Sequence, residues 1–404
     1  MRNLWISSLA GVLLSGAIVA QNAVGLADVA WPNPVAAGTP TLSARIHYPA
    51  QDPGFGARML SVPSPDGFPV VVFLHGYGQL GNDYAQIGDS LAQEGFIAVM
   101  INTAMHSYQT LEQDARGMFP ALVAANTALG SQFRGKLNME QVGLLGHSMG
   151  GAVIAYVLDY DVASPVSNPG YTCGLALAPV NPAIAVSGTQ IRVPLGIVSG
   201  QADPLTPPST HAEPYYQSVT PLSGLKFHYQ MGPTCDHMNI VGLLPHNPTV
   251  FERTQAIIRG FYGQFLSGSL TGLESVLGVD GESDPNLAQL DVQTSIPQAW
   301  SDGTLRIGQV TRVSVALEGG WGGLLAANST TMQPTTTLVG TLLIDPNTAF
   351  TLAEGPVATQ RLDVDILVPN LMALVGSTFA VQGGGATIND PFLLGSALGF
   401  EIGL

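Results

Sequence analysis

The chain has 404 residues, a formal net charge of −15 and 46% hydrophobic residues, with 10% charged ones. This length suffices for two domains, each with a buried core. No nucleic-acid partner is expected, because phosphate binding requires clustered Lys and Arg, whereas the lysines here are limited to Lys136 and Lys226 and no basic run occurs.

A secretory leader is predicted over residues 1–27. Arg2 supplies a positive charge, residues 4–20 are apolar and uncharged, and small residues follow. A run of about 17 residues is short for a helix that stays in a bilayer. We therefore expect cleavage after Ala20, Ala23 or Ala27, secretion to the extracellular space or periplasm, and no stable membrane insertion.

Residues 28–267 alternate apolar runs with helical patterns, which indicates a mostly parallel sheet covered by helices. The run at 70–75 (VVVFLH) is β-branched and ends at a glycine, which is typical of a buried central strand. Further strands are expected at 41–48, 57–62, 97–102, 142–145, 174–178, 194–199 and 225–230. Helices are expected at 85–93, 111–128, 151–158 and 250–266.

The composition changes near residue 267. Residues 268–299 are rich in Gly, Ser and Asp and are predicted to be a linker. Residues 300–404 consist of short alternating runs between turns, which predicts an all-β domain, a β-sandwich. This domain has no histidine. It could serve as a polymer- or cell-surface-binding module, an export element or a spacer.

The sequence Gly146-His147-Ser148-Met149-Gly150 fits the G-x-S-x-G pattern of a nucleophile elbow. In such an elbow the serine sits on a strained turn between a strand and a helix, and side chains at the flanking positions would collide with the backbone. An apolar strand is predicted before the motif and an apolar helix after it. Ser148 is therefore our candidate nucleophile.

A serine hydroxyl requires a histidine to take its proton and an acid to orient that histidine. In this type of fold the chain order is Ser, acid, His. Asp203 follows the strand predicted at 194–199, whereas Asp159 and Asp161 are too close to the elbow helix. We expect Asp203 to be the acid.

Four histidines follow Asp203. His237 lies in a loop beyond the strand at 225–230, at the sheet edge where the elbow also opens. His228 lies inside that strand, His246 lies near the final helix, and His211 is expected at a helix start or rim. His237 is therefore the expected base.

The oxyanion of an acyl-transfer intermediate requires two backbone N–H donors. We expect one from Met149, which follows the nucleophile, and one from Tyr77 in the loop after the strand at 70–75. No metal or organic cofactor is expected for this chemistry. Cys173, at a strand start, and Cys235, after a strand end, are expected at opposite sheet edges and hence unpaired.

The elbow, the Gly76-Tyr77 turn and the acid loop from Asp203 to Tyr216 resemble those of bacterial cutinases and polyester hydrolases of the α/β-hydrolase superfamily. The resemblance spans about residues 40–266 and extends in part to lipase-like and dienelactone-hydrolase-like esterases. It implies an α/β-hydrolase fold with a substrate cleft lined by Tyr77, Gly78, His147 and Val180. Val180 stands where the polyester hydrolases carry a tryptophan, so an aromatic clamp is not expected.

The sequence thus predicts a secreted, monomeric serine hydrolase that cleaves short- or medium-chain esters or polyesters through an acyl-enzyme. Two other interpretations are consistent with the sequence. The same triad could serve an acyltransferase or amidase, or the hydrolase scaffold could belong to a non-catalytic surface-binding protein.

Overall fold

In the computed structural model, the first described residue is Asn22. Most of the predicted leader, residues 1–27, therefore lies outside the described residues. Among the helices that it describes, none is both long and apolar enough to cross a bilayer. The described residues are 22–35, 37–62, 66–159, 168–182, 191–219, 224–317, 320–337, 340–357, 361–386 and 393–404.

A 10-stranded sheet in the order β10-β9-β8-β7-β6-β4-β5-β2-β1-β3 organises the first part of the chain. The strands from β5 to β9 are parallel, whereas β2 pairs antiparallel with β5 and β1, and β10 pairs antiparallel with β9. The short strand β3 pairs parallel with β1. The strands are β1 (Ala23–Pro32), β2 (Thr41–Ala50), β3 (Gly54–Phe55), β4 (Phe68–Leu74), β5 (Ile97–Ile101), β6 (Leu137–His147), β7 (Cys173–Leu177), β8 (Leu195–Gly200), β9 (Leu225–Met231) and β10 (Leu287–Thr294).

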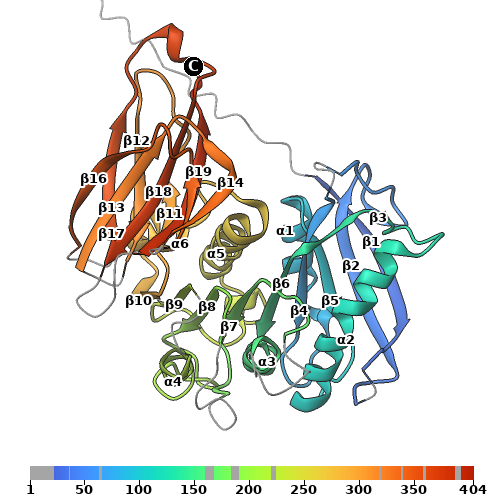
Figure 1. Ribbon diagram of the computed structural model, residues 1–404. Coiled ribbons are helices and arrows are strands. Elements are labelled where there is room, and N and C mark those ends of the chain that lie inside the picture. Colours follow the sequence, from blue (N-terminus) through green and yellow to red (C-terminus); the bar gives the residue numbers. More distant parts are fainter. Residues whose placement is uncertain are drawn as a thin grey trace, which may run out of the picture.

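Helices cover both faces of this sheet (Figure 1). In β4, alternate side chains enter two cores: Val70 and Val72 join the core under α2, α3 and α4, and Val71 and Phe73 join the core under α1 and α5. The mostly parallel α/β architecture is confirmed. The helices are α1 (Ala85–Gln93), α2 (Tyr108–Thr127), α3 (Met149–Leu158), α4 (Ala212–Ser218) and α5 (Pro248–Ser267).

Two strand predictions near the N-terminus differ from the structure. Residues 57–62 form no strand; only Met59 makes an isolated bridge, to Ala50. The chain turns just before this segment, at Gly54 and Gly56, which both have positive φ, and β3, which begins at Gly54, is an edge strand of the sheet. Conversely, β1 begins at Ala23, inside the region predicted as leader, and pairs with β2 along its whole length.

Residues 268–299, predicted to be a linker, are instead structured and packed on the sheet. They contain α6 (Glu274–Leu277), α7 (Val279–Glu282) and β10, which adds to the sheet beside β9. Leu273, Val276 and Leu277 are buried in the α5 core. The abundant Gly, Ser and Asp here form turns between short elements, so composition alone does not distinguish them from a flexible linker.

The C-terminal part consists of antiparallel sheets that lie beside α5 (Figure 1). They have the strand orders β11-β12-β17, β16-β13-β18-β19 and β14-β15. The strands are β11 (Gln298–Ser301), β12 (Val310–Ala316), β13 (Gly320–Ala327), β14 (Thr330–Thr337), β15 (Gly340–Ile344), β16 (Phe350–Val357), β17 (Arg361–Leu367), β18 (Thr378–Ala386) and β19 (Leu393–Glu401).

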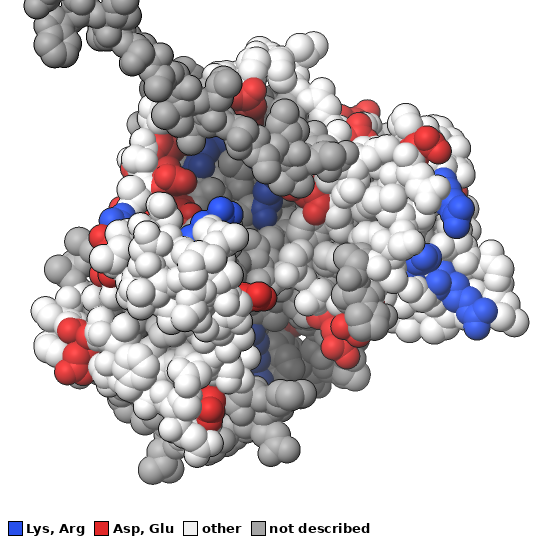
Figure 2. Space-filling view, turned by 90° about the horizontal axis from the view of Figure 1, so that it is seen from above, with Lys and Arg blue, Asp and Glu red and all other residues white. Residues whose placement is uncertain are grey.

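The sequence contains no basic run, and the surface agrees with this. On the face shown in Figure 2, acidic and basic side chains are scattered over a mostly uncharged surface.

Cys173 and Cys235 are both buried and unpaired, as expected from their strand positions. Burial raises the pKa of both thiols, which keeps them protonated and unreactive.

Candidate active site

Ser148 occupies the sharp turn between β6 and α3. Its backbone has φ 53° and ψ −113°, a conformation that a non-glycine residue adopts only when its surroundings enforce it. The Ser148 N–H donates to Leu177 O at 3.0 Å, and its carbonyl accepts from the Val180 N–H at 3.1 Å. These bonds to the end of β7 hold the serine in the strained turn.

The two glycines of the motif are required by close backbone packing. A Cβ at Gly146 would collide with the backbone of Gly150 and Gly151, and one at Gly150 would collide with Leu74. Both contacts are with backbone atoms, which cannot move aside as a flexible side chain can. The G-x-S-x-G spacing therefore has the steric origin expected from the sequence.

Asp203 and His237 meet at the same edge of the sheet, although they come from loops after different strands, β8 and β9. His237 Nδ1 donates to Asp203 Oδ2 at 2.8 Å. Asp203 also accepts from the N–H groups of Leu205 and Thr206, at 2.8 Å each, so it forms an Asx-type turn as well. Both side chains are buried.

The pKa of the Asp203 carboxyl lies below its usual value. Burial acts to raise this pKa, but hydrogen bonds from His237 and Thr206 favour the ionised form and outweigh burial. Asp203 is thus a carboxylate that fixes the imidazole with its proton on Nδ1 and leaves Nε2 available.

The N–H groups around the elbow leave two donors unused. Gly76 donates to the Tyr84 hydroxyl, Gly78 to Met105 O, and Gly150 to His75 O. In the described part of the chain, the N–H groups of Tyr77 and Met149 make no hydrogen bond. The Met149 N–H also lies at the N-terminus of α3, where the helix dipole favours negative charge. These are the two donors predicted for an oxyanion.

The hydroxyl of Ser148 and Nε2 of His237 are likewise unpaired in the described residues. The His147 ring, adjacent to Ser148 in the chain, lies 4.6 Å from the His237 ring between centroids. Asp203 and His237 are therefore bonded to each other, and His147 brings the His237 loop against the elbow, while the Ser148 hydroxyl and His237 Nε2 make no hydrogen bond to each other.

Residues 35–233 match the sequence model of a family described as PET hydrolase-like. This part of the chain is similar to the PET hydrolase-like family of α/β-hydrolases. The resemblance to cutinases and polyester hydrolases inferred from the motifs is thereby confirmed.

Curated relatives of this chain carry related names. A bis(hydroxyethyl) terephthalate hydrolase of Streptomyces coelicolor is 30% identical over 171 residues, which is 41% of this chain and 51% of that protein. The cutinase est1 of Thermobifida alba is 27% identical over 235 residues, 55% and 73% of the two chains. The cutinase 2 of Thermobifida cellulosilytica is 26% identical over 170 residues, 41% and 60%. The chain thus spans about half the length of the first of these relatives.

Of the residues expected to line the substrate cleft in this chain, three lie at the elbow rim. Tyr77 is 60% exposed, Gly78 follows it, and Val180 is bonded through its N–H to Ser148 O. His147 differs. It is 1% exposed, and both of its ring nitrogens are occupied, by Tyr84 and by the His237 carbonyl, so it has no group left for a substrate.

Thr206 belongs to the site but was not singled out in the sequence. Its Oγ1 lies 2.7 Å from Asp203 Oδ2, 3.0 Å from His237 Nδ1 and 3.1 Å from Ala178 O. The available signal is its position three residues after Asp203, where the hydroxyl of a Ser or Thr can bond back to the turn carboxylate.

A second Ser, His and Asp set lies inside the sheet. Ser199 Oγ is 2.7 Å from His228 Nε2, whereas His228 Nδ1 is 3.7 Å from Asp291 Oδ2, beyond hydrogen-bond length. Ser199 is 1% exposed and His228 is fully buried, and both lie within regular strands, β8 and β9. This set has neither a strained serine nor a helix N-terminus beside it, and the Ser199 side chain is buried.

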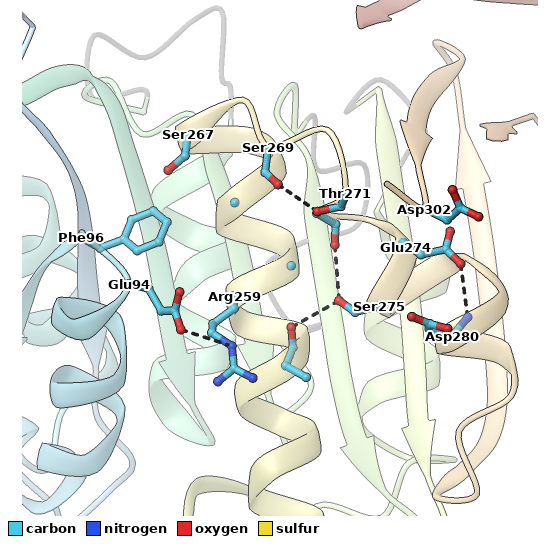
Figure 3. Close-up of a pocket in the computed structure, with 14 residues that line it drawn as sticks. Glu94, Phe96, Arg259, Ser267, Ser269, Thr271, Glu274, Ser275, Asp280 and Asp302 are labelled. Atoms are coloured by element: carbon cyan, nitrogen blue, oxygen red, sulfur yellow. Dashed lines mark hydrogen bonds and ion pairs between the residues drawn. The ribbon is translucent and has the colours of Figure 1, made fainter. Parts of the chain in front are cut away.

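A cavity of about 570 Å³ lies at the other end of the sheet (Figure 3). Its walls include Glu94 and Phe96, just before β5, and Ser267 at the end of α5. The candidate site follows the carboxyl ends of the parallel strands, so the cavity and Ser148 are at opposite ends. The described residues contain no cluster of His, Cys, Asp or Glu suited to a metal ion, so the acidic residues of this cavity do not form one.

Proposed function

We propose that the chain is a serine carboxylic ester hydrolase in which Ser148 is the nucleophile, His237 the general base and Asp203 the acid that orients His237. The observation that carries this proposal is the strained Ser148 at the start of α3 beside two unused N–H groups. A serine held in this conformation has a cost of about 1–3 kcal/mol that a purely structural residue would not require.

In the proposed reaction, Ser148 Oγ attacks the ester carbonyl as His237 Nε2 takes the hydroxyl proton. The N–H groups of Tyr77 and Met149 bind the oxyanion of the tetrahedral intermediate. The protonated His237 then gives its proton to the leaving alcohol, and an acyl-enzyme remains. Water, deprotonated by His237, attacks this acyl group in the same way and releases the acid.

The proposed substrates are short- or medium-chain esters or polyester chains. The names of the relatives support this class, as does the exposed apolar rim formed by Tyr77 and Leu205, which are 60% and 64% exposed. Val180 offers a smaller surface than a tryptophan would, so aliphatic esters are proposed over aromatic polyesters.

The test compares two serine variants with wild-type protein. Ser148→Ala should lower kcat on a soluble butyrate ester by at least about 10⁴-fold, as loss of a triad nucleophile does, and should abolish labelling by a fluorophosphonate. Ser199→Ala is the matched control and should keep both the activity and the label. If Ser199→Ala lost activity and label while Ser148→Ala kept both, Ser199 would be the nucleophile. A wild-type protein without esterase activity would refute the hydrolase proposal.

For the whole chain we propose secretion and a C-terminal β-sandwich. The sandwich is supported by one apolar core to which both larger C-terminal sheets contribute, with Val313 and Val315 from β12 facing Leu324 of β13 and Val381 of β18. Secretion is supported by the predicted leader. Contact of this domain with a polymer or cell surface, and a monomeric state, remain predictions.

A further inference from the structure

Three hydrogen bonds join Gly76, Tyr84, His147 and His237 in a single chain. The Gly76 N–H lies 3.1 Å from the Tyr84 hydroxyl, which lies 2.9 Å from His147 Nδ1, and His147 Nε2 lies 2.8 Å from the His237 carbonyl oxygen. Tyr84 and His147 are each 1% exposed. The proposed triad does not use either side chain for chemistry.

The two backbone groups at the ends of this row of hydrogen bonds fix which atom donates and which accepts in each bond. A backbone N–H can only donate and a carbonyl can only accept. The Tyr84 hydroxyl therefore accepts from Gly76 and donates to His147 Nδ1, and His147 donates from Nε2 to His237. This arrangement requires a neutral imidazole. Burial, and then the neighbouring His237, lower the pKa of His147 to about 3, which keeps the ring neutral at ordinary pH.

This row of hydrogen bonds contacts three segments that carry proposed catalytic groups. Gly76 precedes Tyr77, a proposed oxyanion donor, and His147 precedes Ser148. The His237 carbonyl belongs to the proposed base itself. A Cβ at Gly76 would lie 3.0 Å from the Tyr84 hydroxyl, 3.1 Å from His147 Nδ1 and 3.4 Å from the Ser148 Cβ, so the glycine allows the phenol to approach the loop.

We propose that Tyr84 and His147 are positioning residues that hold the oxyanion loop, the elbow and the base loop in register. The three segments come from different parts of the chain, and the buried bonds between them fix their relative placement. Displacement of a reacting group by about 1 Å can cost about 100-fold in rate. This inference rests on the proposed function of the Ser148 site.

Tyr84→Phe tests the proposal, because it removes only the hydroxyl. We expect kcat on a soluble ester to fall about 10- to 100-fold while KM changes less than about twofold, since the loss affects transition-state geometry. Tyr171→Phe is the matched control: its buried hydroxyl donates to Ala115 O at 2.7 Å, away from these loops. It should lower the melting temperature to a similar extent and leave kcat within about twofold.

Variants of His147 keep the test decisive if Tyr84→Phe fails to fold. His147→Phe keeps a ring but breaks both bonds, whereas the amide of His147→Gln can donate to His237 O and accept from Tyr84. We expect His147→Phe to lose kcat as Tyr84→Phe does, the double variant to lose little more, and His147→Gln to recover part of the loss.

Two results would overturn the proposal while the hydrolase function stands: equal kcat values for Tyr84→Phe and Tyr171→Phe, or fully additive losses in the double variant. A wild-type protein without esterase activity would instead refute the proposed function.

Discussion

At the scale of single residues, the Thr206 hydroxyl supports the Asp203–His237 pair. Its hydroxyl contacts both the Asp203 carboxylate and the ring nitrogen that Asp203 binds. We expect Thr206→Val to raise the Asp203 pKa, because it removes a hydrogen bond to the charged form. A less firmly oriented His237 should lower kcat/KM on a soluble ester by about tenfold.

Thr206→Ser provides the control, since it keeps the hydroxyl and loses only a methyl group. It should retain most of the wild-type kcat/KM in the same assay. If the two variants were equally impaired, the methyl group rather than the hydroxyl would be the important part of Thr206.

The principal site residues follow from local patterns, and their supporting partners do not. The spacing of glycines around Ser148 and the chain order of Ser, Asp and His are visible in the sequence. Tyr84 lies in the short 3-10 turn Gly81–Tyr84, one of 11 tyrosines, and its bond to His147 spans 63 residues. Such a contact depends on how two loops are placed by the folded sheet, which no local pattern encodes.

At the scale of elements, two strands carry buried neutral histidines. His147 ends β6 and has a pKa of about 3; His228 lies in β9, where burial lowers its pKa to about 4. Both folded-state values lie below the unfolded value of about 6.5. The folded protein therefore binds fewer protons, and the stability from these residues is lost as pH falls below about 6.5.

As the pH falls from 6.5 to 4.5, each histidine should lower the free energy of unfolding with a slope that starts at about 0.7 kcal/mol per pH unit and approaches at most about 1.4. Urea unfolding at several pH values measures this slope. His228→Gln should reduce it by the contribution of one ring. An unchanged slope in that variant would mean that His228 is not held neutral in the fold.

The element predictions succeed where periodicity is strong. The helix at 85–93 has the expected bounds, because apolar spacing and flanking turns agree there. Strand β1 was hidden by the leader signal, since both are apolar. Strand β10 was not predicted because, as an edge strand, it has mostly half-buried side chains and no run of fully buried apolar residues.

At the scale of the whole molecule, the first and second parts of the chain share a core. Trp300 of β11 is fully buried among residues of α5 and α6, and its indole N–H donates to Glu274 Oε2 at 2.9 Å. Arg361 of β17 reaches back to Leu277 O at 2.8 Å and to Glu282 at 3.0 Å. The C-terminal sheets are therefore not an independent appendage on a flexible tether.

A truncation after Ser267 should consequently be much less stable than one after Ser301. The shorter chain loses β10, the buried residues of α6, and Trp300, and burial of one large side chain is worth about 3–5 kcal/mol. Urea unfolding of the two chains gives the difference, and activity on a soluble ester reports whether the site survives. Equal stability would show that these contacts contribute little.

The start of β1 also limits where a processing peptidase can cut. The pairing of Ala23 to Pro32 with β2 begins at Ala23 itself. Removal of a leader up to Ala27 would delete half of this strand and expose the matching part of β2, whereas cleavage after Ala20 preserves the pairing. If the proposed secretion takes place, the intact mass of the exported protein should correspond to an N-terminus no later than Ala23.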